Sequence, residues 1–121
     1  MRNKAKVQVT IAAGASLSGA ANLGDKILCA IIVPATWTAA ALTFQVSDDN
    51  GVTWYEMYDY LGNEENVAVG NVTAGGRFYV DPSDFASVDL IKVRSGTLAA
   101  PVDQATAATL SLVGRKFYAL D

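Results

Sequence analysis

Residues 42–58, LTFQVSDDNGVTWYEMY, give the clearest indication of the fold in this sequence. Every second residue from Leu42 to Val46 is apolar, which is the period of a strand with one buried face. The closing run TWYEMY is rich in residues that pack well on a pleated surface. Between the two runs, Asn50-Gly51 supplies residues that tolerate the positive φ of a tight turn. The stretch therefore predicts a β-hairpin.

The remainder of the chain predicts more strands of the same kind. Alternating or β-branched runs are separated by short segments rich in Gly, Pro, Asn and Asp, and these runs are residues 4–12, 26–33, 67–72, 77–80, 88–95 and 106–117. Asp81 and Pro82 predict one short helical turn, with the aspartate as N-cap. About eight short strands predict an all-β fold, a single domain over residues 1–121, built as an antiparallel β-sandwich of jelly-roll or Greek-key type. An immunoglobulin-like sandwich is the alternative, although its Cys…Trp…Cys spacing is absent.

The core is expected to come from the apolar faces of these strands. The run at residues 26–33 is continuously apolar, which favours a strand buried on both faces, and Lys92 and Arg94 are expected to point away from the core. The residues predicted to be buried are Ile27, Cys29, Ile31, Leu42, Phe44, Val46, Trp54, Leu90, Val93, Leu110 and Leu112.

The hairpin loop SDDNGVTW resembles the Asp-box, S-x-D-x-G-x-T-W. The matching residues are Ser47, Asp49, Gly51, Thr53 and Trp54. The resemblance implies a structural turn, in which the Asp and Ser or Thr side chains hydrogen-bond the turn backbone and the Trp packs beneath. The box is found in sialidases and in many non-enzymatic β-domains. A sialidase repeats it around a propeller, whereas this chain carries one copy in 121 residues, so a sialidase is rejected.

A calcium site at Asp48, Asp49 and Asn50 is the alternative for this loop, because clustered oxygens suit a hard cation. The spacing does not match the twelve-residue calcium loop, which ends in a bidentate Glu. A self-capped turn is therefore favoured, and no metal ligand is predicted.

Composition narrows the function classes. Hydrophobic residues make up 51% and charged residues 17% of the chain, and the net charge is −3. No run of Lys or Arg is present, so no nucleic-acid partner is expected. The single cysteine excludes an internal disulfide. No signal peptide and no membrane-spanning run is recognised, so we expect synthesis and folding in a cytoplasm and no membrane partner.

Catalysis is not expected. The chain has no histidine, which removes His-based triads and the commonest general base. No phosphate-binding motif is present, so no cofactor is predicted. The acidic residues do not form an evident pair across a substrate, and they are Asp48, Asp49, Glu56, Asp59, Glu64 and Glu65. We therefore predict a protein that is not an enzyme and has no catalytic residues.

Aromatic residues near the hairpin suggest binding instead. A two-residue period places Trp54, Glu56, Tyr58 and Tyr60 on one face, opposite Tyr55 and Met57. Most of the aromatic rings are expected in the core. The candidates for a ligand or partner contact are Tyr55, Tyr60 and Trp37.

Residues 16–97 resemble a group of small proteins encoded among tailed-phage structural genes. The shared features are Leu-Gly ahead of a buried strand, Pro-x-x-Trp-Thr, Leu-Thr-Phe-Gln with its Asp-rich turn, and Lys-Val-Arg-Ser-Gly-Thr. The resemblance implies a virion component made in the host cytoplasm: a capsid decoration or cement protein, a head-associated protein, or a module of a spike or tail fibre. The alternative function is a carbohydrate-binding module that recognises a cell-surface glycan.

A virion role implies protein partners. The expected partners are further copies of the chain, with a trimer slightly favoured, and virion proteins such as the major capsid protein. Low charge and the Ala-rich segments at residues 39–41 and 99–100 favour close contact with other backbones. Lys4 and Lys6 at one end, and Arg115 and Lys116 at the other, are the charges expected to guard edge strands.

Overall fold

The structure, a computed structural model, describes residues 4–72 and 75–116. Nearly all regular structure in these residues is extended, and one 3-10 turn, η1 (Pro82–Phe85), begins at the predicted cap, where Asp81 Oδ1 accepts a hydrogen bond from Ser83 N at 3.1 Å. The strands are β1 (Lys4–Ile11), β2 (Ala21–Asn22), β3 (Ile27–Ile32), β4 (Ala40–Ser47), β5 (Tyr55–Glu56), β6 (Val67–Val72), β7 (Arg77–Tyr79), β8 (Leu90–Ser95) and β9 (Ala108–Arg115).

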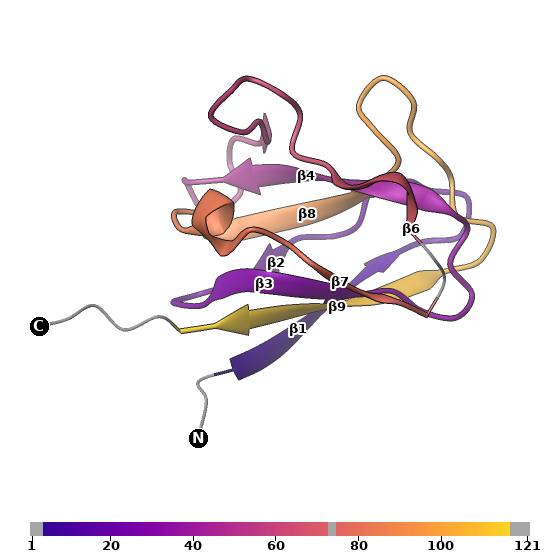
Figure 1. The fold of residues 1–121 in the computed structure, drawn as a ribbon, viewed down its shortest axis with the longest axis horizontal. Helices are drawn as coiled ribbons and strands as arrows, with labels where there is room; N and C mark the ends of the chain where they lie inside the picture. The colour runs from indigo at the N-terminus through magenta and orange to yellow at the C-terminus, as the bar shows by residue number, and fades with distance from the viewer. Residues whose placement is uncertain (1–3, 73–74, 117–121) are drawn as a thin grey trace, which may run out of the picture.

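These strands form two antiparallel sheets. Sheet A has four strands in the order β1-β9-β3-β7, and sheet B has five, in the order β2-β8-β4-β5 with β6 also paired to β4. Figure 1 shows β4 and β8 of sheet B lying over β3 and β9 of sheet A. The prediction of an all-β sandwich is confirmed. Each sheet pairs strands from the two halves of the chain, so neither sheet is complete without both halves.

The core lies between the two sheets. Phe44 of β4 is 1% exposed, and its ring meets the edge of the Phe85 ring with centroids 5.3 Å apart and planes at 87°. This edge-to-face arrangement is one that aromatic pairs prefer. Of the predicted core residues, six are buried: Ile31, Leu42, Phe44, Val93, Leu110 and Leu112. The other five, Ile27, Cys29, Val46, Trp54 and Leu90, are only partly buried.

Strand β3 shows why part of that prediction is wrong. Leu28 and Ile31 are fully buried, whereas Ile27 and Cys29 are half-buried. The pairing of β3 with β9 shifts between Leu28 and Ala30, as in a β-bulge. A bulge changes which residues face the core, so one alternating pattern cannot describe the whole strand. The continuous apolar run therefore has one fully buried face and one partly covered face.

Strand β8 requires a second correction. Ile91 and Val93 face the core and are fully buried, so Leu90 falls on the other face and is half-buried. Arg94 shares that outer face, yet it is 6% exposed. The expectation that Arg94 points away from the core is correct, but it is covered by other parts of sheet B.

The sheet edges also differ from expectation. β9 lies between β1 and β3, so Arg115 does not guard an edge. β1 is the long edge strand of sheet A, and it pairs with β9 along its full length. The Ala-rich segment at residues 39–41 does not form a flat loop, because Ala40 and Ala41 belong to β4 and are buried. None of the helical structure in the described residues is long and apolar enough to cross a membrane.

Candidate functional site

The hairpin loop after β4 is a self-capped turn. Ser47 Oγ accepts a hydrogen bond from Gly51 N at 2.9 Å and donates one to Asp49 Oδ1 at 2.9 Å. Asp49 Oδ1 also accepts one from Thr53 N at 2.8 Å. Asn50 and Gly51 have φ values of 60° and 87°, as the dipeptide predicted. The hydrogen bonds from Thr53 and Ser47 hold the pKa of the Asp49 carboxyl below its usual value.

The Trp54 side chain packs against one side of the turn. Its Nε1 donates a hydrogen bond to Gly51 O at 3.0 Å, and the Lys92 ammonium lies 4.4 Å from the centre of its ring. The ring is half-buried outside the core, between the turn and the outer face of β8. The predicted structural turn is therefore present at all five Asp-box positions, with Trp54 at the surface of the sheet and not inside the sandwich.

Replacing Ser47 by alanine is expected to destabilise the protein by about 1–2 kcal/mol. Ser47 is fully buried, and its loss leaves the Gly51 N–H without its acceptor. Urea unfolding followed by tryptophan fluorescence measures the change. Asp48→Ala is the matched control, because Asp48 is exposed and lies outside this hydrogen-bond set, and it should change stability by less than about 0.5 kcal/mol. Equal losses in the two variants would contradict the capping role of Ser47.

Calcium is expected to leave the melting temperature unchanged, because Asp49 Oδ1 is already occupied by Thr53 N and Ser47 Oγ. Differential scanning fluorimetry with micromolar calcium and then with chelator tests this expectation. A melting temperature that rises with calcium and falls with chelator would support the metal interpretation of this loop. Within the described residues, no three His, Cys, Asp or Glu are grouped so as to hold a metal ion.

A buried arginine supports the segment that follows the turn. The Arg94 guanidinium makes two hydrogen bonds to the Glu56 carboxylate, at 2.7 and 3.0 Å, and lies 3.6 Å from Glu64. Gln45 Nε2 also donates to Glu56 at 2.7 Å, and Arg94 donates to Thr43 Oγ1. Arg94 holds the pKa of the Glu56 carboxyl below its usual value, although partial burial opposes the shift. The network attaches the segment from residue 56 to residue 64 to the outer face of sheet B.

Beyond this network, the chain turns back on itself at a capped loop. Asp59 Oδ1 accepts hydrogen bonds from Leu61 N and Asn63 N, each at 2.9 Å. The Glu64 carboxylate accepts another from Leu98 N at 2.9 Å, which connects this loop to the loop after β8. Tyr60 lies at the tip and is 91% exposed. The loop therefore presents an aromatic ring to solvent from a backbone that is held at several points.

Exposed apolar side chains gather in these segments. Six of the seven large hydrophobic residues that are exposed in the described part of the chain lie in two linked segments, residues 52–61 and the loop that contains Leu98. We call them the tyrosine patch, and its members are Val52, Tyr55, Tyr58, Tyr60, Leu61 and Leu98. The seventh, Tyr79, lies on sheet A with Arg77 stacked 4.8 Å from its ring centre.

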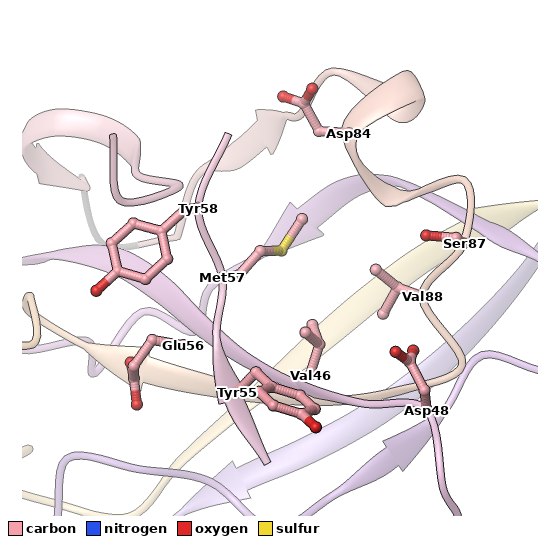
Figure 2. Close-up of a pocket in the computed structure, with 9 residues that line it drawn as sticks. All are labelled: Val46, Asp48, Tyr55, Glu56, Met57, Tyr58, Asp84, Ser87 and Val88. Atoms are coloured by element: carbon pink, nitrogen blue, oxygen red, sulfur yellow. The ribbon is translucent and has the colours of Figure 1, made fainter. Parts of the chain in front are cut away.

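A surface pocket of about 390 Å³ borders the tyrosine patch. Figure 2 shows Asp48 and Asp84 on two sides of it, with apolar side chains between them. The pocket is lined by Val46, Asp48, Tyr55, Glu56, Met57, Tyr58, Asp84, Ser87 and Val88. Lysine and arginine are absent from this lining, so its charged groups are all carboxylates.

A further acidic residue, Glu65, interacts with Asp84 of the pocket lining. Burial raises the pKa of the Glu65 carboxyl to about 7, with further contributions from Asp84, Asp59 and Asp81. Glu65 Oε1 is buried and has no hydrogen-bond donor among the described residues. A proton on Glu65 would allow it to donate to Asp84, whereas two ionised carboxylates would repel each other. Glu65 is therefore the titrating group of this region near neutral pH.

Raising the pH from about 4.5 to about 7 is expected to reduce stability by about 1–2 kcal/mol, because the native state binds the Glu65 proton more tightly than the unfolded chain does. A folded pKa above the unfolded value gives stability that is present at low pH and is lost as the pH rises. The chain has no histidine that would titrate in this window. Urea unfolding at several pH values measures the slope, and Glu65→Gln should remove it. An unchanged slope in that variant would assign the titration to another group.

The three predicted contact residues differ in their exposure to solvent. Tyr55 and Tyr60 are exposed, at 56% and 91%, and both lie in the segment from residue 52 to residue 61 that supplies most of the tyrosine patch. Trp37 is 6% exposed and packs in the core, so its ring is not available to a partner. The predicted two-residue period fails after Glu56, where β5 ends: Tyr55 is exposed while Met57, two residues on, is buried.

Two elements of the site were missed by the sequence analysis. Arg94 was expected to be an ordinary outward charge, and Asp84 was not considered as part of a binding surface. The available signal was weak in both cases, because each residue lies far along the chain from the segment that it meets. Comparison with known protein families and with curated proteins finds no match to this chain.

Proposed function

We propose that this chain is a non-enzymatic structural component of a tailed-phage virion, either a capsid decoration or cement protein or another head-associated protein. The observation that carries the proposal is the tyrosine patch, because several exposed apolar side chains in two linked segments are typical of protein contacts. Tyrosine is also among the residues enriched at such contacts. In the particle, the tyrosine patch is the surface that contacts a neighbouring subunit.

The way the patch is held supports the same proposal. The Arg94 network and the Asp59 cap order the backbone that carries Tyr58 and Tyr60 before any partner arrives. A surface that is ordered in advance loses less conformational entropy on binding. A subunit that must attach to many equivalent positions on a shell benefits from this property.

Self-association is the second part of the proposal. β1 is a long edge strand, and along it Lys6, Gln8 and Thr10 are exposed while its described pairing is to β9 alone. An unpaired edge can add a strand from another copy, although Lys6 opposes indiscriminate pairing. A trimer is the assembly that we favour.

We also assign the sandwich to the jelly-roll class, because each sheet interleaves early and late strands.

Attachment to particles tests the proposal. Purified chain would be mixed with particles that lack it, pelleted, and quantified against the major capsid protein. The double variant Tyr60→Ser with Leu61→Ser removes the tip of the patch and should reduce attachment at least about tenfold. Tyr79→Ser is the matched control, because Tyr79 is exposed on the other sheet, and it should attach as the unmodified chain does. Equal loss in both variants would overturn the assignment of the patch.

A carbohydrate-binding module is the second candidate, and the pocket is the observation that favours it. Two exposed tyrosines, Tyr55 and Tyr58, stand beside carboxylates that can accept hydrogen bonds from sugar hydroxyls. A glycan array probed with the purified chain distinguishes the two roles. Specific glycan binding that Tyr55→Ala abolishes, together with no attachment to particles, would replace the virion proposal with this one.

A further inference from the structure

We propose that the pocket bordering the tyrosine patch receives an arginine side chain from a partner protein. This inference rests on the proposed function for the nature of the partner, a neighbouring protein subunit. The chemistry of the pocket itself is independent of where the chain is located.

The lining of the pocket matches a cation that is carried on an apolar stem. Met57 and Val88 are buried and Val46 is half-buried, and Figure 2 shows these three side chains lying between Asp48 and Asp84. A hydrated metal ion gains nothing from such a floor, whereas the aliphatic part of a long basic side chain packs on it. A volume of about 390 Å³ is enough for one such side chain.

The charges of the pocket are of one sign. Glu56 is compensated by Arg94, but no described lysine or arginine forms an ion pair with Asp48 or Asp84 at this pocket. Asp84 also has Glu65 beside it, with Asp81 and Asp59 close to Glu65. The uncompensated carboxylates therefore favour a positively charged occupant over a neutral one.

The tyrosine rings select the kind of cation. Tyr55 and Tyr58 are each about half exposed at the rim of the pocket, so their rings are available for stacking. A guanidinium is planar, stacks on aromatic rings and can reach carboxylates with several donors at once. An ammonium group makes the same charge contact without the planar stacking. Arginine should therefore bind more tightly than lysine.

Occupation of the pocket is linked to the protonation of Glu65. A cation close to Asp84 favours the ionised form of Glu65, so binding should release its proton and become stronger as the pH rises from about 5 to about 8. The groups that face Glu65 are Asp84 and Asp81 from the η1 region and Asp59 from the capped loop. Glu65→Gln should make the affinity independent of pH in this range.

Nuclear magnetic resonance titration of the whole chain tests the inference, with the ring signals of Tyr55 and Tyr58 as readout. The probes are the N-acetyl methylamides of arginine, lysine and norleucine, and N-acetylglucosamine. We expect arginine to shift these signals most, lysine to bind about threefold more weakly, and norleucine to bind at least about tenfold more weakly. Tyr55→Ala and Asp84→Asn should each weaken arginine binding about threefold to tenfold.

Tyr79→Ala and Asp103→Asn are the matched controls, because both residues are exposed and neither lines the pocket. They should leave the arginine affinity unchanged. Equal shifts from arginine and norleucine, or saturable binding of N-acetylglucosamine alone, would overturn the inference. Arginine binding by a chain that is absent from virions would uphold the pocket and remove the virion role, so the two proposals fail separately.

Discussion

Phe44→Ala is expected to lower the free energy of unfolding by about 3–5 kcal/mol. Phe44 is 1% exposed. Removing its ring takes away both the free energy gained by transferring the ring out of water and the edge-to-face contact with Phe85. Phe44 lies in the middle of β4 of sheet B, and Phe85 ends the 3-10 turn η1, which joins β7 of sheet A to β8 of sheet B.

Urea unfolding measures this loss. Phe44→Leu is the informative companion, because it keeps most of the volume and should cost less than about 2 kcal/mol. Tyr55→Ala removes an aromatic ring from the same hairpin at a position that is 56% exposed, and it should cost less than about 0.5 kcal/mol. A loss below about 1 kcal/mol for Phe44→Ala would mean that β4 presents its other face to the core.

Arg94→Met is expected to destabilise the protein by about 2–3 kcal/mol at pH 7. The methionine fills much of the same space, but the Glu56 carboxylate is left with Gln45 as its remaining side-chain partner. The cost is smaller than for a fully enclosed pair, because 19% of the Glu56 side chain is exposed. The capped loop should also become less ordered, since Glu64 loses its contact with Arg94.

The double variant Arg94→Met with Glu56→Leu separates charge from packing. Removing both charges should restore at least about half of the lost stability, because the Glu56 carboxylate is then no longer left half-buried without Arg94, although Glu64 still loses its contact with Arg94. The pKa of Glu56 is lowered in the folded protein, so the contribution of the pair is present above the unfolded pKa and is lost as the pH falls through the folded value. The difference between Arg94→Met and the unmodified chain should shrink in acid. A constant difference would assign the effect of Arg94 to packing alone.

The elements that local sequence determines were predicted well. The Ser47 to Trp54 turn depends on side chains that cap the backbone within a few residues, so its hydrogen bonds follow from the sequence of the loop. The cap at Asp81 is local for the same reason. The overall sandwich was also predictable, because many short alternating runs between turn residues have few other ways to bury their apolar faces.

Contacts between distant segments were not predictable. The register shift at Leu28 arises where β3 pairs with β9, which is distant from it in the sequence. No feature of the run at residues 26–33 indicates this shift. Arg94 follows an alternating pattern that correctly places it on the outer face. Its burial depends on the topology, because residues 56–64 fold across that face. The pocket has the same origin, because Asp48 and Asp84 come from separate parts of the chain.

The protein content of purified virions tests whether this chain is a structural component of a tailed-phage virion. The test uses particles of the tailed phage to which the proposal assigns the chain; they would be washed at high salt, and their proteins quantified by mass spectrometry against the major capsid protein. The virion proposal predicts that this chain remains with the particles in a fixed ratio to the capsid protein, and that cryo-electron microscopy places it with the tyrosine patch against a neighbouring subunit. Particles that lack the chain, together with specific glycan binding by the purified protein, would contradict the proposal.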